Sequence, residues 1–251
     1  CLAAASLRIP VVLHESDAVM GKANAMIAKR AEIICLGLPA TSNQQLANSI
    51  VTGNPIRPSI LAGSKAEGLR LTGFSGTRPV LLVYGGSQGT QVFNEWVVRH
   101  IDELLKMADV IHLTGKGKKG AAPRTGYFVR EFAHEELAHL YAITSLAISR
   151  AGSGNIAELA AHGIPAVLIP IEGLAQNHQV RNAEIAAAQG GCIVISQQAI
   201  EGKLRECVRV TLGDEKMREQ LSKKIGTLHE PQAANRIANA VLEVMENHLP
   251  D

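Results

Sequence analysis

Aromatic residues are scarce in this chain of 251 residues, because Phe, Trp and Tyr together make up only 3% of it. Base-stacking platforms for single-stranded nucleic acid are therefore not expected. The charge is nearly balanced, with 25 Lys and Arg against 23 Asp and Glu, which argues against a large basic surface for nucleic acid. No apolar run approaches the roughly 18–20 residues of a membrane-spanning helix. These scarcities favour a globular protein whose ligands are not nucleic acids.

Cysteine is also sparse. The four cysteines, Cys1, Cys35, Cys192 and Cys207, form no CxxC pair, and no histidine stands at a zinc-site spacing from two of them. We therefore expect small core side chains in a reducing compartment, with no metal and no cofactor. The chain starts inside an apolar stretch, CLAAASLRIPVVLH, which lacks the charged segment and cleavage site of a signal peptide. This start predicts that the natural N-terminus lies upstream and that the first domain is incomplete.

Short apolar, β-branched segments alternate with segments of helical periodicity along most of the chain. Strands that are apolar on both faces and separated by helices are typical of a parallel sheet that is covered on both sides. The alternation therefore predicts an α/β protein with a doubly wound parallel sheet. The expected strands are residues 11–14, 33–36, 80–84, 110–113, 127–129, 146–149, 166–169 and 192–195. The expected helices are residues 22–31, 91–107, 135–141, 155–162, 177–189, 199–212, 215–225 and 232–247.

A stretch rich in proline and glycine, from Thr52 to Pro79, interrupts this alternation. The residues before Pro55 and Pro58 are disfavoured in helical geometry, because each proline ring crowds the residue ahead of it. The stretch predicts a crossing between two domains, and the part before it offers only two strands. We therefore divide the chain into an N-terminal domain remnant (1–57), a linker (58–79), a C-terminal domain (80–230) and a terminal helix (231–251).

Two glycine-rich loops each follow an expected strand and precede an expected helix. They are GGSQG at residues 85–89 and SRAGSGN at residues 149–155. Glycine allows a sharp turn and a close approach of backbone N–H groups, and a helix start adds a positive dipole end. Two such loops at one sheet edge predict a phosphorylated ligand, although each loop alone is compatible with a simple tight turn. GGSQG is not the GxGxxG of dinucleotide-binding oxidoreductases, so a nicotinamide cofactor is not expected.

Three polar side chains lie on the helices that follow. Glu158 lies one turn into its helix, where a carboxylate can accept two hydrogen bonds from a sugar diol; the same position also favours an acidic residue without any ligand. Gln179 and Asn182 are three residues apart and so share one helical face. Amides donate and accept hydrogen bonds at once, which suits sugar hydroxyls. His14 and His178 are weaker candidates, because a lone histidine is more often a cap or a structural partner.

Five segments in order resemble the MurG family of bacterial glycosyltransferases. They are HESDAVMGKAN, TGNPIR, VYGGSQGTQVFN, SRAGSGNIAELAAHGIPAVLIPI and NHQVRNAE, and together they span nearly the whole chain. Enzymes of this family move N-acetylglucosamine from UDP-N-acetylglucosamine to undecaprenyl-linked muramoyl-pentapeptide (lipid I to lipid II), with inversion, in peptidoglycan synthesis for cell division and cell shape. The resemblance implies a GT-B fold of two Rossmann-like doubly wound parallel-sheet domains, with the last helix packing back towards the first domain. It also implies a peripheral position at the cytoplasmic membrane surface.

The resemblance further implies roles for particular residues in binding UDP-N-acetylglucosamine. Arg57 and Ser87 would contact the diphosphate, and Ala133 would meet the uracil through its backbone. Glu158 would hold the ribose hydroxyls, and Gln179 would bond the hydroxyls of the sugar. The remaining substrate-binding positions are Ser153, Gly154 and Asn155 beside the diphosphate and sugar, and Asn182 near Gln179.

The resemblance also implies that Asp17 binds substrate, but Asp17 departs from the family, which commonly has asparagine at this place in a HEQN-like motif. An ionised carboxylate accepts hydrogen bonds but cannot donate them, so the choice of donor sugar could differ. The family's glycine-rich loop with its histidine, the usual general base, is expected upstream of residue 1. Two alternatives stay open: a related UDP-sugar transferase with another lipid acceptor, and a nucleotide-binding fragment without activity.

Overall fold

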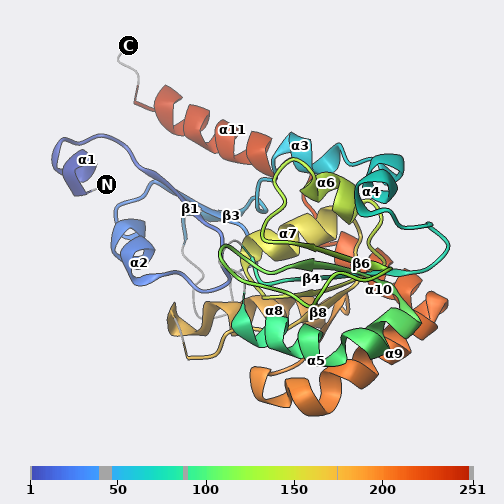
Figure 1. Cartoon of the computed structure of the whole chain (residues 1–251). Helices are drawn as coiled ribbons and strands as arrows, with labels where there is room; N and C mark the ends of the chain where they lie inside the picture. The colour runs from blue at the N-terminus through green and yellow to red at the C-terminus, as the bar shows by residue number, and fades with distance from the viewer. Residues whose placement is uncertain (1, 40–46, 87–89, 174, 249–251) are drawn as a thin grey trace.

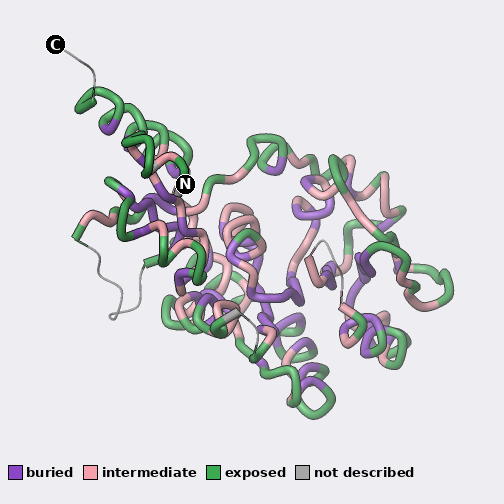
Figure 2. The backbone as a smooth tube through the Cα atoms, turned by 90° about the vertical axis from the view of Figure 1, so that its left-hand side faces the viewer, coloured by how far each residue is buried: buried purple, intermediate pink, exposed green. Residues whose placement is uncertain are grey.

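The computed structural model describes residues 2–39, 47–86, 90–173 and 175–248, which form two parallel β-sheets with helices around them (Figure 1). The small sheet has three strands in the order β1-β2-β3, and the large sheet has six in the order β6-β5-β4-β7-β8-β9. Buried residues gather in the interior, and the outer turns of the helices are exposed (Figure 2). The predicted α/β class with parallel sheets is confirmed.

The small sheet contains β1 (Val12–Glu15), β2 (Ile33–Leu36) and β3 (Ser49–Val51), all parallel. The sequence predicted only the first two, so the expectation of a two-stranded remnant was wrong. β3 was missed because three residues are too few to show a periodic pattern. Two of them, Ile50 and Val51, are exposed at the sheet edge, so the burial that makes other strands recognisable is absent there.

Helices from both ends of the chain cover the small sheet. α2 (Lys22–Ala28) packs against β1 and ends at Ala28 instead of reaching residue 31, and Ala4 of the short helix α1 (Leu2–Ser6) adds to the same core. α11 (Ala233–Glu246), at the opposite end of the chain, packs against β1 and β2. The small sheet is therefore completed by residues from both termini (Figure 1).

The large sheet is built from strands that are mostly buried on both faces. All six were predicted to within one residue at each end. β4 lies between β5 and β7, so the direction of winding reverses between β4 and β7. The loops after two such strands diverge and leave a crevice at the carboxyl edge, where ligands of doubly wound sheets bind. The strands are β4 (Val80–Tyr84), β5 (Asp109–Leu113), β6 (Tyr127–Arg130), β7 (Leu146–Ser149), β8 (Ala166–Leu168) and β9 (Cys192–Val194).

Helices cover both faces of the large sheet, which gives the doubly wound arrangement that the alternation predicted. On one face, α5 (Gln91–Met107) and α9 (Arg205–Gly213) bury side chains such as Trp96 against the strands. The predicted helix 199–212 is in fact a π-helical turn, η3 (Ile200–Leu204), continued by α9. The other face carries α6 (Leu137–Tyr141), α7 (Ser153–Ala161), α8 (His178–Ala188) and α10 (Glu215–Gly226).

Residues 58–79, predicted as a linker, contain two short helices, α3 (Pro58–Leu61) and α4 (Lys65–Thr72). Both pack against α6, and the side chains of Ile60 and Phe74 are buried in the core on that face of the large sheet. The proline-rich composition concealed these helices, because Pro58 occupies the first helical position, where its missing N–H costs no hydrogen bond. This segment is therefore attached to the helices of the large sheet.

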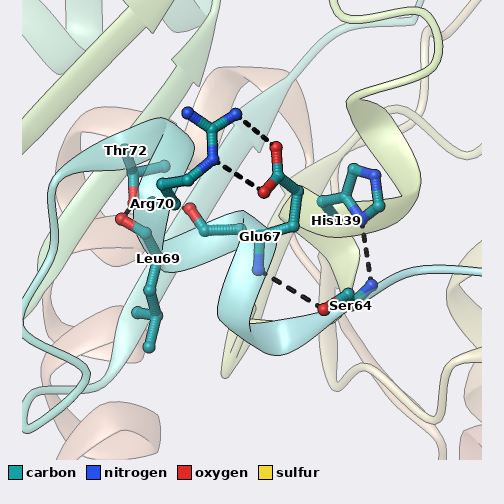
Figure 3. Close-up of polar contacts among 7 residues, drawn as sticks. Ser64, Glu67, Leu69, Arg70, Thr72 and His139 are labelled. Atoms are coloured by element: carbon teal, nitrogen blue, oxygen red, sulfur yellow. Dashed lines mark hydrogen bonds and ion pairs between the residues drawn. The ribbon is translucent and has the colours of Figure 1, made fainter.

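A capping arrangement fixes the start of α4. The Ser64 hydroxyl accepts a hydrogen bond from the Glu67 N–H, and the Ser64 N–H donates to Nδ1 of His139 on α6 at 2.9 Å (Figure 3). Glu67 also pairs with Arg70 one turn later. The Ser-x-x-Glu spacing is a helix-start signal that the sequence analysis overlooked. The cap and the bond to His139 together hold α4 against α6.

His112 lies at the centre of a buried polar network beneath α5. The Tyr127 hydroxyl accepts from the Ala121 N–H and donates to His112 Nδ1 at 2.8 Å. His112 Nε2 then donates to Oδ1 of Asn94 at 2.9 Å, and Asn94 Nδ2 donates to the Thr114 carbonyl. Because Asn94 Oδ1 can only accept, the single proton of the neutral ring lies on Nε2, and Nδ1 accepts from Tyr127. Burial lowers the pKa of His112 to about 4.

We expect this histidine to make stability fall as the solution is acidified from pH 6.5 towards pH 4. The unfolded ring takes up a proton near pH 6.5, whereas the folded ring stays neutral until about pH 4, so the contribution of His112 is fully present only above pH 6.5. The loss between those limits is on the order of 3 kcal/mol. Urea unfolding at a series of pH values measures it. A His112→Gln variant should be less stable at pH 7 but less sensitive to acid, and an unchanged acid sensitivity would contradict the assignment.

Candidate functional site

The crevice lies where β4 and β7 end side by side. Tyr84 and Ser149 are register partners at the ends of these strands, and each strand leads into a helix, α5 or α7. The residues that precede the two helices, Thr90 and Gly152, make no side-chain capping bond, so the first N–H groups remain available. A Cβ placed on Gly86 would lie 3.7 Å from Asn155 Nδ2, which brings the two loops together. Two helix starts therefore converge on one anion-accepting place.

A cavity of about 220 Å³ opens beside these loops. It is smaller than the roughly 300–1,000 Å³ of whole ligand sites, so its size suits one ring system of a larger ligand. Three residues predicted as substrate-binding, Ala133, Asn155 and Glu158, line it. The full lining is Tyr84, Gly86, Leu113, Phe132, Ala133, His134, Leu137, Asn155 and Glu158.

Glu158 supplies the carboxylate of this cavity. Its Oε2 accepts a hydrogen bond from the Tyr141 hydroxyl at 2.9 Å, and the Tyr84 hydroxyl lies 3.3 Å from that of Tyr141. Burial raises the pKa of both tyrosines, so both stay protonated and Tyr141 acts as the donor. Oε1 of Glu158 has no hydrogen-bond partner in the described part of the chain. One carboxylate oxygen is thus held in place while the other can bind a ligand.

The three predicted residues at the start of α7 face different surroundings. Asn155 Nδ2 donates to the Ser149 hydroxyl and to the Arg150 carbonyl, which braces the loop. Gly154 is exposed, and a Cβ there would meet nothing within 4 Å. Ser153 is buried and lines a separate, very small cavity towards the small sheet. Asn155 and Gly154 are therefore accessible to a ligand in the crevice, whereas Ser153 faces away from the larger cavity.

Arg150 is a buried cation that the sequence analysis did not single out. Its guanidinium donates to the Ile169 carbonyl at 3.0 Å, to the Thr90 hydroxyl at 3.0 Å and to Gln197 Oε1 at 2.6 Å. It also stacks over the Phe93 ring. Among the described residues no carboxylate pairs with it, and burial lowers its pKa. An arginine directly after a buried strand and before a glycine turn was the available signal. Its charge lies beneath both helix starts.

The other predicted residues lie around this centre. Gln179 on α8 accepts a hydrogen bond from the Ile171 N–H through Oε1, and its Nε2 has no bonded partner among the described residues. Asn182 is fully buried, and its amide is occupied by other protein groups. Arg57 is exposed and lines a neighbouring cavity of about 330 Å³ that shares His134 with the first. Ser87 lies outside the described residues.

Two further observations limit the site. A cavity of about 700 Å³, beside Arg8, Arg30 and His248, contains none of the predicted site residues and is remote from both glycine loops in the sequence. Across residues 2–39, 47–86, 90–173 and 175–248, no group of three or more His, Cys, Asp or Glu side chains is arranged to hold a metal ion. The chemistry of the crevice is therefore that of helix starts, a buried guanidinium and one carboxylate.

Residues 80–237 match the profile of the glycosyltransferase family 28 C-terminal domain. The chain belongs to glycosyltransferase family 28. The match covers the whole large sheet, including both glycine loops and Glu158. The predicted MurG-family membership is confirmed by this match together with the relatives described next.

Enzymes named UDP-N-acetylglucosamine--N-acetylmuramyl-(pentapeptide) pyrophosphoryl-undecaprenol N-acetylglucosamine transferase are similar to this chain. The one from Lachnoclostridium phytofermentans is 39% identical over 206 residues, which are 80% of this chain and 58% of that protein. The one from Legionella pneumophila strain Paris is 35% identical over 242 residues, which are 94% of this chain and 66% of that protein. This family 28 chain thus spans roughly three fifths of the length of these relatives.

A solved structure shows the same fold. The crystal structure of Acinetobacter baumannii MurG superposes with a TM-score of 0.74 at 22% sequence identity, covering 96% of this chain and 69% of that one. At this identity the similarity concerns the fold alone, and it confirms the predicted GT-B architecture. In this family 28 protein the crevice between β4 and β7 therefore lies in the second of two Rossmann-like sheets.

Replacing Arg150 by lysine should destabilise the protein by about 1.5–3 kcal/mol, because an ammonium group cannot reach the Ile169 carbonyl and Gln197 at the same time. Urea unfolding at pH 7 measures the loss. Arg130 provides a matched control, since its guanidinium lies 4.7 Å over the Phe128 ring, as Arg150 does over Phe93, but Arg130 is exposed. Arg130→Lys should change stability by less than about 0.5 kcal/mol. Equal effects at the two positions would contradict the role assigned to Arg150.

Proposed function

We propose that the whole protein transfers N-acetylglucosamine from UDP-N-acetylglucosamine to undecaprenyl-linked muramoyl-pentapeptide, converting lipid I to lipid II, and that this chain carries the donor site. One observation carries the proposal: a ring-sized cavity with a half-free carboxylate opens beside two convergent helix starts. The printed activity of relatives that are 35–39% identical supports the choice of substrates.

The proposed donor lies across the carboxyl edge of the large sheet. The uracil occupies the cavity beside Phe132 and meets the backbone of Ala133. Glu158 accepts hydrogen bonds from the ribose hydroxyls through Oε1, while Tyr141 holds its other oxygen. The diphosphate binds at the starts of α5 and α7, where the Arg150 charge lies beneath it and the exposed Gly154 leaves room for close approach.

The sugar end of the donor extends towards α8. Gln179 donates to the hydroxyls of N-acetylglucosamine through Nε2, because its Oε1 is occupied by the Ile171 N–H. Arg57 reaches the diphosphate from the neighbouring cavity, which shares the lining residue His134 with the first. Asn155 faces the junction of diphosphate and sugar. In this proposal Ser87 also contacts a phosphate of the donor.

The proposed reaction is a displacement with inversion at the anomeric carbon. The acceptor hydroxyl forms a bond to that carbon, the bond from the carbon to the diphosphate oxygen breaks, and UDP leaves with the electron pair. The helix starts and the Arg150 guanidinium stabilise the negative charge that grows on the leaving diphosphate. The acceptor proton passes to a general base that we place outside this chain, in the part of the relatives' length that the chain does not span.

Because the proposed acceptor is linked to a lipid, the sugar transfer is expected to take place at a membrane surface. Within the described residues, no helix combines the length and the apolar character needed to cross a bilayer. We propose a peripheral position on the cytoplasmic face of the plasma membrane, where the undecaprenyl-linked acceptor is reached from the small-sheet side of the crevice. The incomplete coverage of the relatives favours a second candidate, in which this chain alone is a donor-binding module without turnover.

Glu158→Gln is the sharpest test of the donor site. The amide still accepts from Tyr141, which preserves the buried contact, but it has lost the charge offered to the ribose diol. We expect the Kd for UDP, measured by calorimetry, to rise about tenfold or more, as the loss of a charged hydrogen bond predicts. The variant should also lose the discrimination between UDP and 2′-deoxy-UDP.

Glu219→Gln, an exposed change on α10, serves as the control and should leave UDP affinity unaltered. Unchanged affinity in a folded Glu158→Gln variant would refute the donor site. UDP release with lipid I as acceptor tests the transfer itself. Release with a different lipid acceptor alone would favour a related UDP-sugar transferase, and UDP binding without release would favour the donor-binding module.

A further inference from the structure

The side chain of Asn182 joins three separate segments of the chain. Asn182 lies on α8 and is fully buried. Its Oδ1 accepts from the Ala18 N–H at 2.8 Å, and its Nδ2 donates to Asp17 Oδ1 at 2.7 Å and to the Ala151 carbonyl at 3.0 Å. Asp17 and Ala18 follow β1 of the small sheet, whereas Ala151 follows β7 of the large sheet. One amide therefore ties the loop after β1 of the small sheet to the loop after β7 of the large sheet.

These contacts leave the Asn182 amide no capacity to donate to a sugar. An amide has two N–H donors, and both are used, one by a carboxylate and one by a carbonyl. Binding a sugar hydroxyl as a donor would require breaking a bond in a fully buried place, where an unsatisfied group is costly. Asn182 thus differs from Gln179, whose Nε2 stays available one turn earlier on the same helix.

The loop on the small-sheet side is itself held firmly. The buried carboxylate of Glu15 accepts from the Asp17 N–H at 3.0 Å through Oε1, and from the Gly21 N–H and Asn24 Nδ2 through Oε2. Asn54 Nδ2 donates to the Ser16 carbonyl from the other side of the loop. A loop braced in this way transmits the position of Asn182 to β1 and the rest of the small sheet.

The contact on the large-sheet side reaches the candidate donor site. Ala151 is followed by Gly152, which precedes the first turn of α7, and it follows Arg150, the buried cation beneath the helix starts. A bond to the Ala151 carbonyl therefore acts on the loop that we propose binds the diphosphate. The amide of Asn182 links that loop directly to the small sheet.

We propose that Asn182 is a positioning residue that, with Asp17 as its partner, latches the small sheet to the loop after β7 and so fixes how the acceptor side faces the donor site. The latch itself stands on the geometry alone, and its consequence for sugar transfer rests on the proposed function. The carboxylate of Asp17 suits this place, because the Asn182 oxygen is already bonded to the Ala18 N–H and the Asn182 Nδ2 group that faces Asp17 is a donor.

Spin labels on helical segments that pack against the two sheets, one at the end of α2 and one in η3, test the latch independently of any activity. Exposed Lys29→Cys and Lys203→Cys carry the labels in a Cys1→Ser, Cys207→Ser background, where the remaining cysteines, Cys35 and Cys192, are buried. Pulsed electron spin resonance on the full chain gives the distribution of distances between the labels. We expect a narrow distribution for the parent protein and for Asp17→Asn, whose amide oxygen still accepts from Asn182.

Asn182→Asp should broaden the distribution, because its second carboxylate oxygen faces Asp17 and the Ala151 carbonyl, which are both acceptors. Asp17→Ala should broaden the distribution to a smaller extent, since this change removes one of the three bonds of Asn182 without burying a charge. If Asn182→Asp does not fold, Asp17→Ala still tests the latch. Combining Asp17→Asn with Asn182→Asp should narrow the distribution again, because the new amide at position 17 donates to the new carboxylate. A general loss of packing would show no such rescue.

UDP affinity separates the latch from a direct contact with the donor. Asp17→Ala and Asp17→Asn should bind UDP within about twofold of the parent protein, because Asp17 does not line the donor cavity. Distributions for Asp17→Ala and Asn182→Asp that are as narrow as that of the parent would overturn the latch. So would a tenfold loss of UDP affinity in Asp17→Ala without any broadening, which would identify Asp17 as a contact of the UDP part of the donor. Failure of UDP to bind any form would count against the proposed function and leave the distance measurement valid.

Discussion

The reversal of winding between β4 and β7 is the constraint on which the site depends. Neighbouring strands that lead to helices on opposite faces leave a crevice between their loops, and each loop ends in backbone N–H groups without partners inside the helix. Because α5 and α7 both start there, the dipoles of the two helices concentrate positive potential at the crevice. This explains how a chain of nearly balanced charge can offer a place for a diphosphate.

Buried polar groups of the large sheet stabilise this arrangement in two ways. Arg150 is hydrogen-bonded to carbonyl and hydroxyl oxygens and to an amide oxygen, and within the described part of the chain no carboxylate pairs with its charge. His112 is kept neutral by burial, and its hydrogen bonds fix the loop after β5 to α5. The cation is positioned for a ligand, whereas the neutral ring serves the fold alone.

The sequence was most informative where the structure is local. The strands of the large sheet and the glycine turn before α7 were predictable, because a buried parallel strand is apolar throughout and a glycine turn follows it directly. β3 was not, since it is short and exposed, and α3 and α4 were concealed by proline and glycine. The contacts of Asn182 with Ala18 and Asp17 could not be predicted from the sequence, because these residues lie 164 and 165 positions away. Helical spacing placed Asn182 beside Gln179 but could not show that its amide is already bonded.

The covering of β1 and β2 by α11 has a consequence for synthesis of the protein. The small sheet is among the first parts of this chain to leave the ribosome, but the helix that covers it is among the last. Until then the buried faces of β1 and β2 lack one of their packing partners, whereas the large sheet already has its helices. Contacts of such long sequence separation form slowly and leave apolar surface exposed in the meantime. The small sheet therefore stays partly uncovered until the last helix of this chain has been synthesised.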